Sequence, residues 1–221
     1  MEYTPFYLTF KLAICTTTLL FIVVLPLAYI LAHSKWKIKY LFESAFMLPI
    51  ILPPTVLGYY FISMLGPRTK IGAFFHDTLG FDLAFTFQGI LIGSMIYCLP
   101  FMLNPLITGF RSVPRNLIES AQLMGKSKLN ILWKVQLPQI KSFIWSALLL
   151  TFAHTIGEFG VVLMIGGNLP ETKVASVAIY DEMNQFNFEN ANLYALILLG
   201  FSFVFIILLT LVMRKNKSTI A

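Results

Sequence analysis

Four polar side chains recur at helical spacing in an otherwise apolar stretch, TFAHTIGEFG. They are Thr151, His154, Thr155 and Glu158. Spacings of three and four residues place side chains on one face of a helix, so the four are predicted to form a polar stripe. A His and a Glu four residues apart could pair directly. No third ligand accompanies them, so neither a metal site nor a catalytic site is expected, and the stripe is interpreted as a contact between helices or the lining of a transport path.

A second pattern lies in the basic stretch ESAQLMGKSKLNILWKVQLP, within a polar loop of residues 111–141 that we call the docking segment. Its regularly spaced residues are Glu119, Ser120, Ala121, Gly125, Leu137 and Pro138. Gly125 predicts a helix, a turn and a second helix. Glu119 is expected near the start of the first helix, where it complements the macrodipole, and Pro138 is expected to end the second.

Apolar side chains in the same segment have no obvious place in a solvated loop. They are Leu123, Met124, Leu129, Leu132 and Trp133. Apolar anchors beside small residues suit burial against another protein. The segment is therefore predicted to dock on a cytoplasmic partner.

The elements that must position both patterns are membrane spans, because 57% of the 221 residues are hydrophobic and only 12% are charged. A helix needs about 20 apolar residues to cross a bilayer core. Five segments qualify, at residues 12–32, 44–65, 83–110, 142–164 and 191–213. The first is interpreted as a retained helix, since residues 1–10 lack the basic region of a signal peptide. We expect an all-α integral membrane protein with five to six transmembrane helices in a single domain, residues 1–221.

Basic residues gather in alternate connections, which predicts the orientation. They follow the first, third and fifth spans, at Lys35, Lys37, Lys39, Arg111, Arg115, Lys126, Lys128, Lys134, Lys141, Arg214, Lys215 and Lys217. This places the amino terminus outside and the carboxyl terminus in the cytoplasm of a multi-pass protein of the cell (inner) membrane. The net charge of +6 is explained by contact with anionic membrane lipid, and no nucleic acid partner is expected.

Prolines interrupt two of the predicted spans. Pro49, Pro53 and Pro54 fall in the second, and Pro100 and Pro105 in the third. Each removes a backbone donor and is expected to kink its helix. The kinks could serve packing alone or bend the helices around a translocation path.

Other features bound the function. Cys15 and Cys98 lie in apolar spans without partner ligands and are interpreted as packing residues. Gly157 and Gly160 could let another helix approach closely. Residues 166–190 are expected to form a loop outside the membrane, either simply solvated or part of a landing surface for a binding protein. The chain has no GxxxxGK[ST] phosphate loop, so ATP and Mg would be bound by another polypeptide.

The docking segment resembles the EAA motif of type I ABC importer permeases, with Glu119, Ala121, Gly125, Leu137 and Pro138 in register and Ser120 and Val135 departing from it. Three further stretches look like the molybdate permease branch of this family, which is close to the sulfate and tungstate branches: LPIILPPTVLGYY, AHTIGEFG and GGNLPETKVASVAIYD. The chain departs from that branch at His154, where Arg is usual. The resemblance implies the type I permease fold with a cytoplasmic coupling helix, a homodimer, two cytoplasmic ATPase subunits and an external molybdate-binding protein.

Two further hypotheses follow. Glu158 is expected to be oriented by partners in the bundle and not to bind the transported oxyanion directly. The rival of another class is a proton-coupled secondary transporter in which His154 and Glu158 relay a proton; an intramembrane enzyme is disfavoured because no nucleophile with a base is present.

Overall fold

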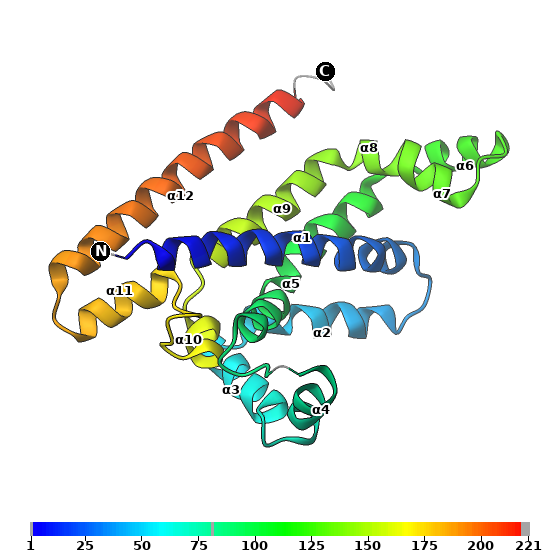
Figure 1. Ribbon diagram of the computed structural model, residues 1–221. Helices are drawn as coiled ribbons and strands as arrows, with labels where there is room; N and C mark the ends of the chain where they lie inside the picture. The colour runs from blue at the N-terminus through cyan, green and yellow to red at the C-terminus, as the bar shows by residue number, and fades with distance from the viewer. Residues whose placement is uncertain (1, 81, 218–221) are drawn as a thin grey trace.

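The computed structural model describes residues 2–80 and 82–217, with side chains described for residues 2–78, 80 and 82–207. Across this range the chain is helical and contains no strand, so the all-α prediction is confirmed (Figure 1). The helices are α1 (Thr4–His33), α2 (Lys39–Ile51), α3 (Pro54–Leu65), α4 (Lys70–Leu79), α5 (Phe87–Ser112), α6 (Arg115–Leu123), α7 (Lys128–Ile131), the π-helical η1 (Leu132–Gln136), α8 (Leu137–Gln139), α9 (Lys141–Ile156), α10 (Gly160–Gly166), α11 (Ala175–Asn184) and α12 (Phe188–Lys217).

Three helices in the described residues, α1, α5 and α12, are long and apolar enough to cross a membrane. Two further predicted spans are broken. The α2–α3 pair bends by 111° and the α9–α10 pair by 59°, and counting each pair as one span gives five. The interruption predicted at Pro53 and Pro54 in the second span is thus present, whereas the break within residues 142–164 was not predicted.

Consecutive prolines explain the first break. A residue that precedes proline is pushed out of the helical region, and both Leu52 and Pro53 precede one. Their ψ angles are 133° and 135°, which are extended values, and α3 then begins with Pro54 at its first turn, where the missing N–H costs nothing. By contrast, Pro100 and Pro105 lie inside α5, which continues through both, and α2 continues through Pro49.

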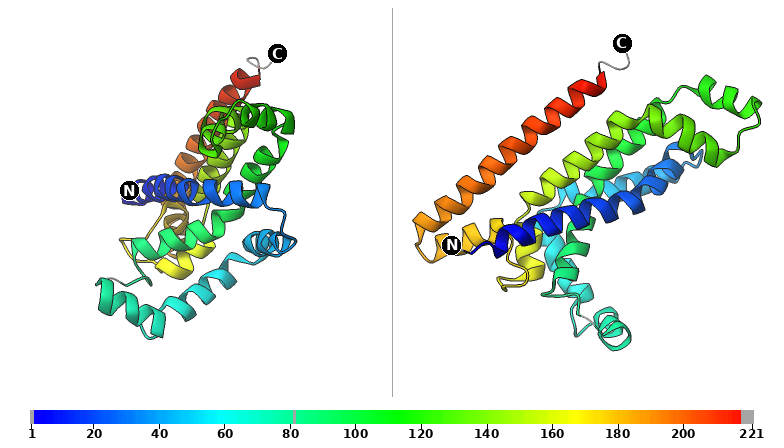
Figure 2. Two further views of the ribbon diagram at one scale, coloured as in Figure 1. Left: turned by 90° about the vertical axis from the view of Figure 1, so that its right-hand side faces the viewer. Right: turned by 45° about the horizontal axis from the view of Figure 1, so that its top comes forward.

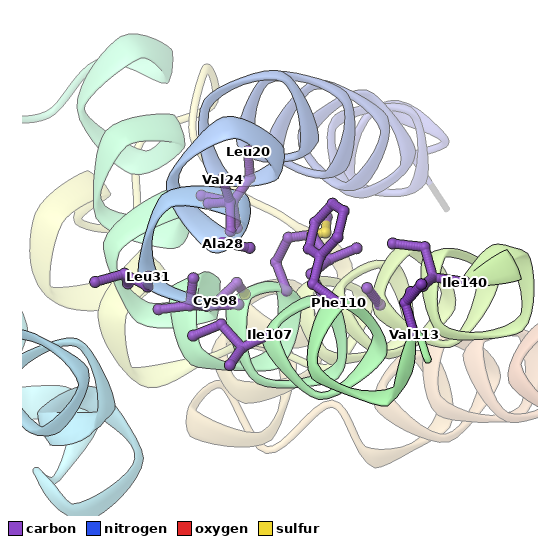
Figure 3. Packing of buried hydrophobic residues seen from close by; sticks show 13 residues of the cluster. Leu20, Val24, Ala28, Leu31, Cys98, Ile107, Phe110, Val113 and Ile140 are labelled. Atoms are coloured by element: carbon purple, nitrogen blue, oxygen red, sulfur yellow. The ribbon is translucent and has the colours of Figure 1, made fainter. Parts of the chain in front are cut away.

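The main core lies where α1, α5 and α9 pack side by side (Figure 2). Val24 and Ala28 of α1 and Cys98 and Leu106 of α5 belong to one cluster of buried side chains, and all four are fully buried. Figure 3 shows Val24, Ala28 and Cys98 within this cluster. Ala147 on α9 is also fully buried, and its small side chain lets the three backbones approach closely. The contact between these three helices forms the centre of the fold, and the other elements pack around it.

The last span lies at the edge of this frame. α12 contacts α11 and α9, and its most apolar window is only 11% buried (Figure 1). The side chains of Arg214, Lys215 and Lys217, used for the predicted orientation, lie outside the described residues.

The connection before α12, residues 166–190, contains the helix α11 and is not the expected loop. Three residues of that helix are buried because α11 packs on both α12 and α1: Ala175, Val177 and Ala178.

Candidate functional site

The two helix breaks come together in space. α10, which follows the second break, packs across α3, which follows the first. A side chain at Gly160 would have its Cβ 2.7 Å from Cβ of Pro54, and one at Gly58 would overlap Met164. The predicted close approach at Gly160 is confirmed, whereas a Cβ at Gly157 would meet only the His154 carbonyl oxygen, at 3.9 Å.

A cavity of about 490 Å³ opens at this crossing. Its lining comes from α3, α5, α9, α10 and the second break, and consists of Pro54, Thr55, Tyr97, Ala153, His154, Gly157, Glu158, Phe159 and Gly160. Broken helices can present unpaired backbone groups at membrane depth only where protein or a wet cavity satisfies them. The cavity is therefore placed where a permeating polar solute would meet backbone as well as side chains.

The predicted polar stripe is split by the second break. Thr151, His154 and Thr155 belong to α9, but that helix ends at Ile156, and Glu158 lies beyond its carboxyl-terminal cap, Gly157. No hydrogen bond joins His154 to Glu158, and both Nε2 of His154 and the Glu158 carboxyl oxygens are buried without a hydrogen-bond partner in the described structure. The hypothesis of a direct His154–Glu158 pair is wrong for this conformation, because Gly157 redirects the chain between them.

Glu158 is instead directed toward α5. Its side chain is 4% exposed, and Ser94, Tyr97 and Cys98 of α5 are the groups that interact electrostatically with its carboxyl. Its backbone carbonyl accepts a hydrogen bond of 2.6 Å from the Ser176 hydroxyl, which ties the break to α11. The second helix break is thus held by a hydrogen bond to its backbone. The Glu158 carboxyl itself has no hydrogen-bond partner in the described structure.

Several hydroxyl groups are buried in the three-helix core. Thr155 donates to the Thr151 carbonyl at 2.8 Å and lies 3.3 Å from the Cys98 sulfur. The hydroxyls of Thr16, Ser94 and Thr151 are buried without partners in the described structure. Buried polar groups are normally hydrogen-bonded, so this cluster is the most polar and least satisfied part of the core. We call Ser94, Tyr97, Cys98, Thr151, His154, Thr155 and Glu158 the break site.

His154 packs among aromatic rings. Its ring centroid lies 4.0 Å from that of Phe101 and 5.1 Å from that of Tyr97. The imidazole therefore contributes as an aromatic packing group that forms one wall of the cavity. No cluster of three potential metal-ligating side chains occurs in the described residues.

The sequence analysis missed the contribution of α5. Ser94, Tyr97 and Cys98 recur at three- and four-residue spacing, which is the signal that identified the stripe on α9. Cys98 is the buried packing residue that was expected, but it also lies against Thr155 and Glu158.

The docking segment projects from the opposite end of α5 and α9 (Figures 1 and 2). It contains the predicted helix, turn and second helix. Gly125 forms the turn with φ of +71°, in the left-handed region that favours glycine, and its N–H bonds to the Gln122 carbonyl. Ala121 is the buried small residue of the first helix, whereas Ser120 is exposed.

Four of the five predicted apolar docking side chains are exposed, whereas the fifth, Leu132, is half-buried against the core. Leu123 is 89% exposed, Met124 74%, Leu129 70% and Trp133 64%. Four large exposed apolar groups around one turn are unusual for a solvated surface and typical of a protein–protein contact. The geometry agrees with a docking role.

Two local expectations for the segment are wrong. Glu119 is the fifth residue of α6, which begins at Arg115, so it does not lie in the first turn. Pro138 does not end the second helix, which continues through η1 and α8 to Gln139. The π-helical turn before Pro138 widens the backbone and accommodates the ring that an α-helical turn would exclude.

A polar network marks the connection between α10 and α12. Lys173 Nζ lies 2.7 Å from Asp181 Oδ2, and the Asn168 amide donates to Asp181 Oδ1 at 2.6 Å. The hydrogen bond from Lys173 lowers the pKa of Asp181 below its usual range, with a smaller contribution from Asn168.

The fold, with its broken helices and projecting segment, is that of a membrane permease. A solved bacterial ABC transporter involved in the import of the acidic polysaccharide alginate has the same fold, with a TM-score of 0.79 and 16% identity over 96% of this chain and 78% of that one. Residues 24–218 match the family described as the binding-protein-dependent transport system inner membrane component. The chain belongs to this family and is the permease component of an ABC importer.

Relatives from two branches are similar over most of the chain. The molybdenum transport system permease protein ModB of Azotobacter vinelandii is 38% identical over 199 residues, which is 89% of this chain and 88% of that protein. The sulfate transport system permease protein CysT of Synechococcus elongatus is 29% identical over 197 residues, 89% of this chain and 70% of that protein.

Proposed function

We propose that this chain, as a homodimer, forms the translocation path of an ATP-driven importer of molybdate. The observation that carries the ATP-driven part is the exposed apolar face of the docking segment, built from Leu123, Met124, Leu129 and Trp133 around Gly125. A secondary transporter needs no such face. ATP and Mg would be bound by two ATPase subunits docked there, and this chain would perform no chemistry.

The choice of molybdate is supported by the 38% identity to ModB along nearly the whole of both chains. Identity to the sulfate permease of Synechococcus elongatus is lower, at 29%. Tungstate and sulfate are the alternatives within the same mechanism. An external binding protein would deliver the oxyanion and supply most of the discrimination.

The cavity at the helix breaks is the proposed point of passage. Thr55 and Tyr97 line it with hydroxyl groups that can donate hydrogen bonds to an oxyanion, and His154 forms one of its walls. Glu158 belongs to the same lining, and its carboxyl oxygens are buried. In this proposal Glu158 is a positioning residue of the path and not a ligand of the anion.

The orientation completes the proposal. The docking segment and the carboxyl terminus would face the cytoplasm, and the amino terminus, α11 and the Lys173–Asp181 network would face outward. Support comes from the basic residues of the docking segment and of the α1–α2 connection.

The test is uptake at low oxyanion concentration into cells that lack their own carriers and express this chain with its ATPase and binding protein. Molybdate uptake that persists under excess sulfate is expected. Uptake that sulfate abolishes would assign the chain to the sulfate branch, and equal use of molybdate and tungstate would broaden the substrate to both.

A further inference from the structure

A basic cleft of about 780 Å³ lies at the end of the bundle that carries the docking segment. Lys35 and Lys39 line it from the α1–α2 connection, Arg111 from the end of α5 and Arg115 from the start of α6. Glu119 is the one acidic residue in this lining.

Two of these cations are held in place by the protein. Arg111 pairs with Glu43 of α2, which braces α5 against α2, and Lys39 Nζ donates to the Ser34 carbonyl at 2.7 Å. Lys35 and Arg115 are exposed and have no hydrogen bond or ion pair with any described residue. Four cations thus face two carboxylates, Glu43 and Glu119, and the cleft is complementary to an anion.

The stretch of residues 35–41, which supplies Lys35 and Lys39 to the cleft, has the composition of a membrane–water interface. Its lysines are interspersed with large apolar and aromatic side chains, of which Trp36, Tyr40 and Leu41 are 75%, 62% and 67% exposed. Amphipathic aromatic side chains between lysines are typical of segments at headgroup level. The cleft therefore opens where the spans α1 and α5 leave the bilayer.

A second cavity of about 500 Å³ adjoins it and shares His33, Ser34, Ile118 and Gln122 in its lining. The rest of this cavity is mainly apolar, with Tyr29, Ile30, Trp36 and Ile131 on its walls beside Lys128 and Gln136. A bound molecule that fills both spaces must be anionic at one end and apolar at the other.

We propose that the basic cleft binds the phosphate headgroup of an anionic phospholipid, with the apolar part of that lipid in the adjoining cavity. A free oxyanion would leave the apolar cavity unused. Since Arg115, Ile118 and Gln122 lie on α6, the bound lipid would brace the docking segment against the ends of α1 and α5. The inference depends on neither the transported anion nor the homodimer.

The test is lipid binding to the full chain purified in detergent, titrated with phosphatidylglycerol or phosphatidylcholine and followed by native mass spectrometry. The cleft variant is Lys35→Gln with Arg115→Gln. The matched control is Arg68→Gln with Lys70→Gln, two exposed cations outside the cleft that remove the same charge. Each cation at a lipid surface contributes about fivefold in affinity, so the cleft variant should bind phosphatidylglycerol about 25-fold more weakly. The control should bind it like the unmodified chain, and Lys35→Arg with Arg115→Lys should retain binding.

Three results would overturn the proposal. Equal loss in the cleft variant and the control would mean that only overall charge matters. Equal affinity for the two lipids would mean that no anionic headgroup is recognised. Displacement of phosphatidylglycerol by millimolar inorganic phosphate would assign the cleft to a free oxyanion.

Discussion

The break site and the docking segment are incomplete in opposite ways. In the break site, Glu158 and the hydroxyls of Ser94 and Thr151 are buried with no hydrogen-bond partner in the described structure. In the docking segment, Leu123 and Trp133 are apolar and exposed. A buried polar group without a partner and an exposed apolar group without cover are both costly, and each indicates something that the isolated chain lacks. The buried polar groups of the break site need polar ligands or water inside the membrane. The exposed apolar groups of the docking segment need an apolar protein surface outside it.

The most severe test of this contrast is Gly125→Val. A β-branched residue is strained at a φ of +71°, so the turn should open and the two docking helices should separate. We expect ATP-dependent uptake to fall to background while the chain still inserts in the membrane. The measurement is uptake together with co-purification of the ATPase.

Gly80→Val is the matched control, because Gly80 has φ of +72° and, like Gly125, no atom near the position of a Cβ. The same local strain there should leave uptake and ATPase binding largely intact. Normal uptake with Gly125→Val, or equal loss with Gly80→Val, would contradict the docking assignment.

A smaller effect is expected for Trp133→Ala. Loss of an interface anchor typically costs about 2 kcal/mol, so affinity for the ATPase should fall about 30-fold while the melting temperature of the chain alone stays unchanged. Titration of the ATPase onto the solubilised chain measures this. Trp145→Ala removes another exposed Trp, outside the docking segment, and should leave the affinity unchanged.

The sequence predicted the docking segment better than the break site, for physical reasons. Gly125 and its exposed apolar neighbours are signals within one short segment, and local geometry decides them. The break site depends on where a helix stops. Helical spacing placed Glu158 on one stripe with His154, but Gly157 ends α9 between them, so the carboxyl faces Ser94 and Cys98 on a helix about sixty residues earlier. Likewise, Pro53 and Pro54 predicted a kink, and only the structure shows a turn of 111° that brings α3 onto α10.

Glu158→Gln tests the buried, unpartnered carboxyl of the break site. The neutral amide is cheaper to bury than an unpartnered carboxylate, so the melting temperature should stay level or rise by up to about 4 °C. The concentration of oxyanion at half-maximal uptake should not change if Glu158 positions the path without binding the anion, as proposed. Glu43→Gln makes the same chemical change in a carboxyl that has a partner, Arg111, and should lower the melting temperature. A larger loss of stability with Glu158→Gln than with Glu43→Gln would contradict this account.

The smallest effect is expected at Asp181, on α11. Its pKa is lowered mainly by Lys173, so its ion pair stabilises the folded chain fully above the unfolded pKa of about 3.9. That contribution is lost as the pH falls through the lower folded value. Asp181→Asn should therefore lower the melting temperature slightly at pH 7, and the difference from the unmodified chain should shrink below about pH 4. Asp77→Asn, in an exposed residue with no ion pair to a described residue, should show no such pH dependence.

The most direct test of the central claim is transport by proteoliposomes that contain this chain with its ATPase subunits, supplied with the binding protein and molybdate. Accumulation that requires ATP and hydrolysis, and that persists when a protonophore collapses the proton gradient, is the predicted result. Accumulation that continues without ATP and disappears with the proton gradient would contradict it, and would restore the proton-coupled transporter as the function of the break site.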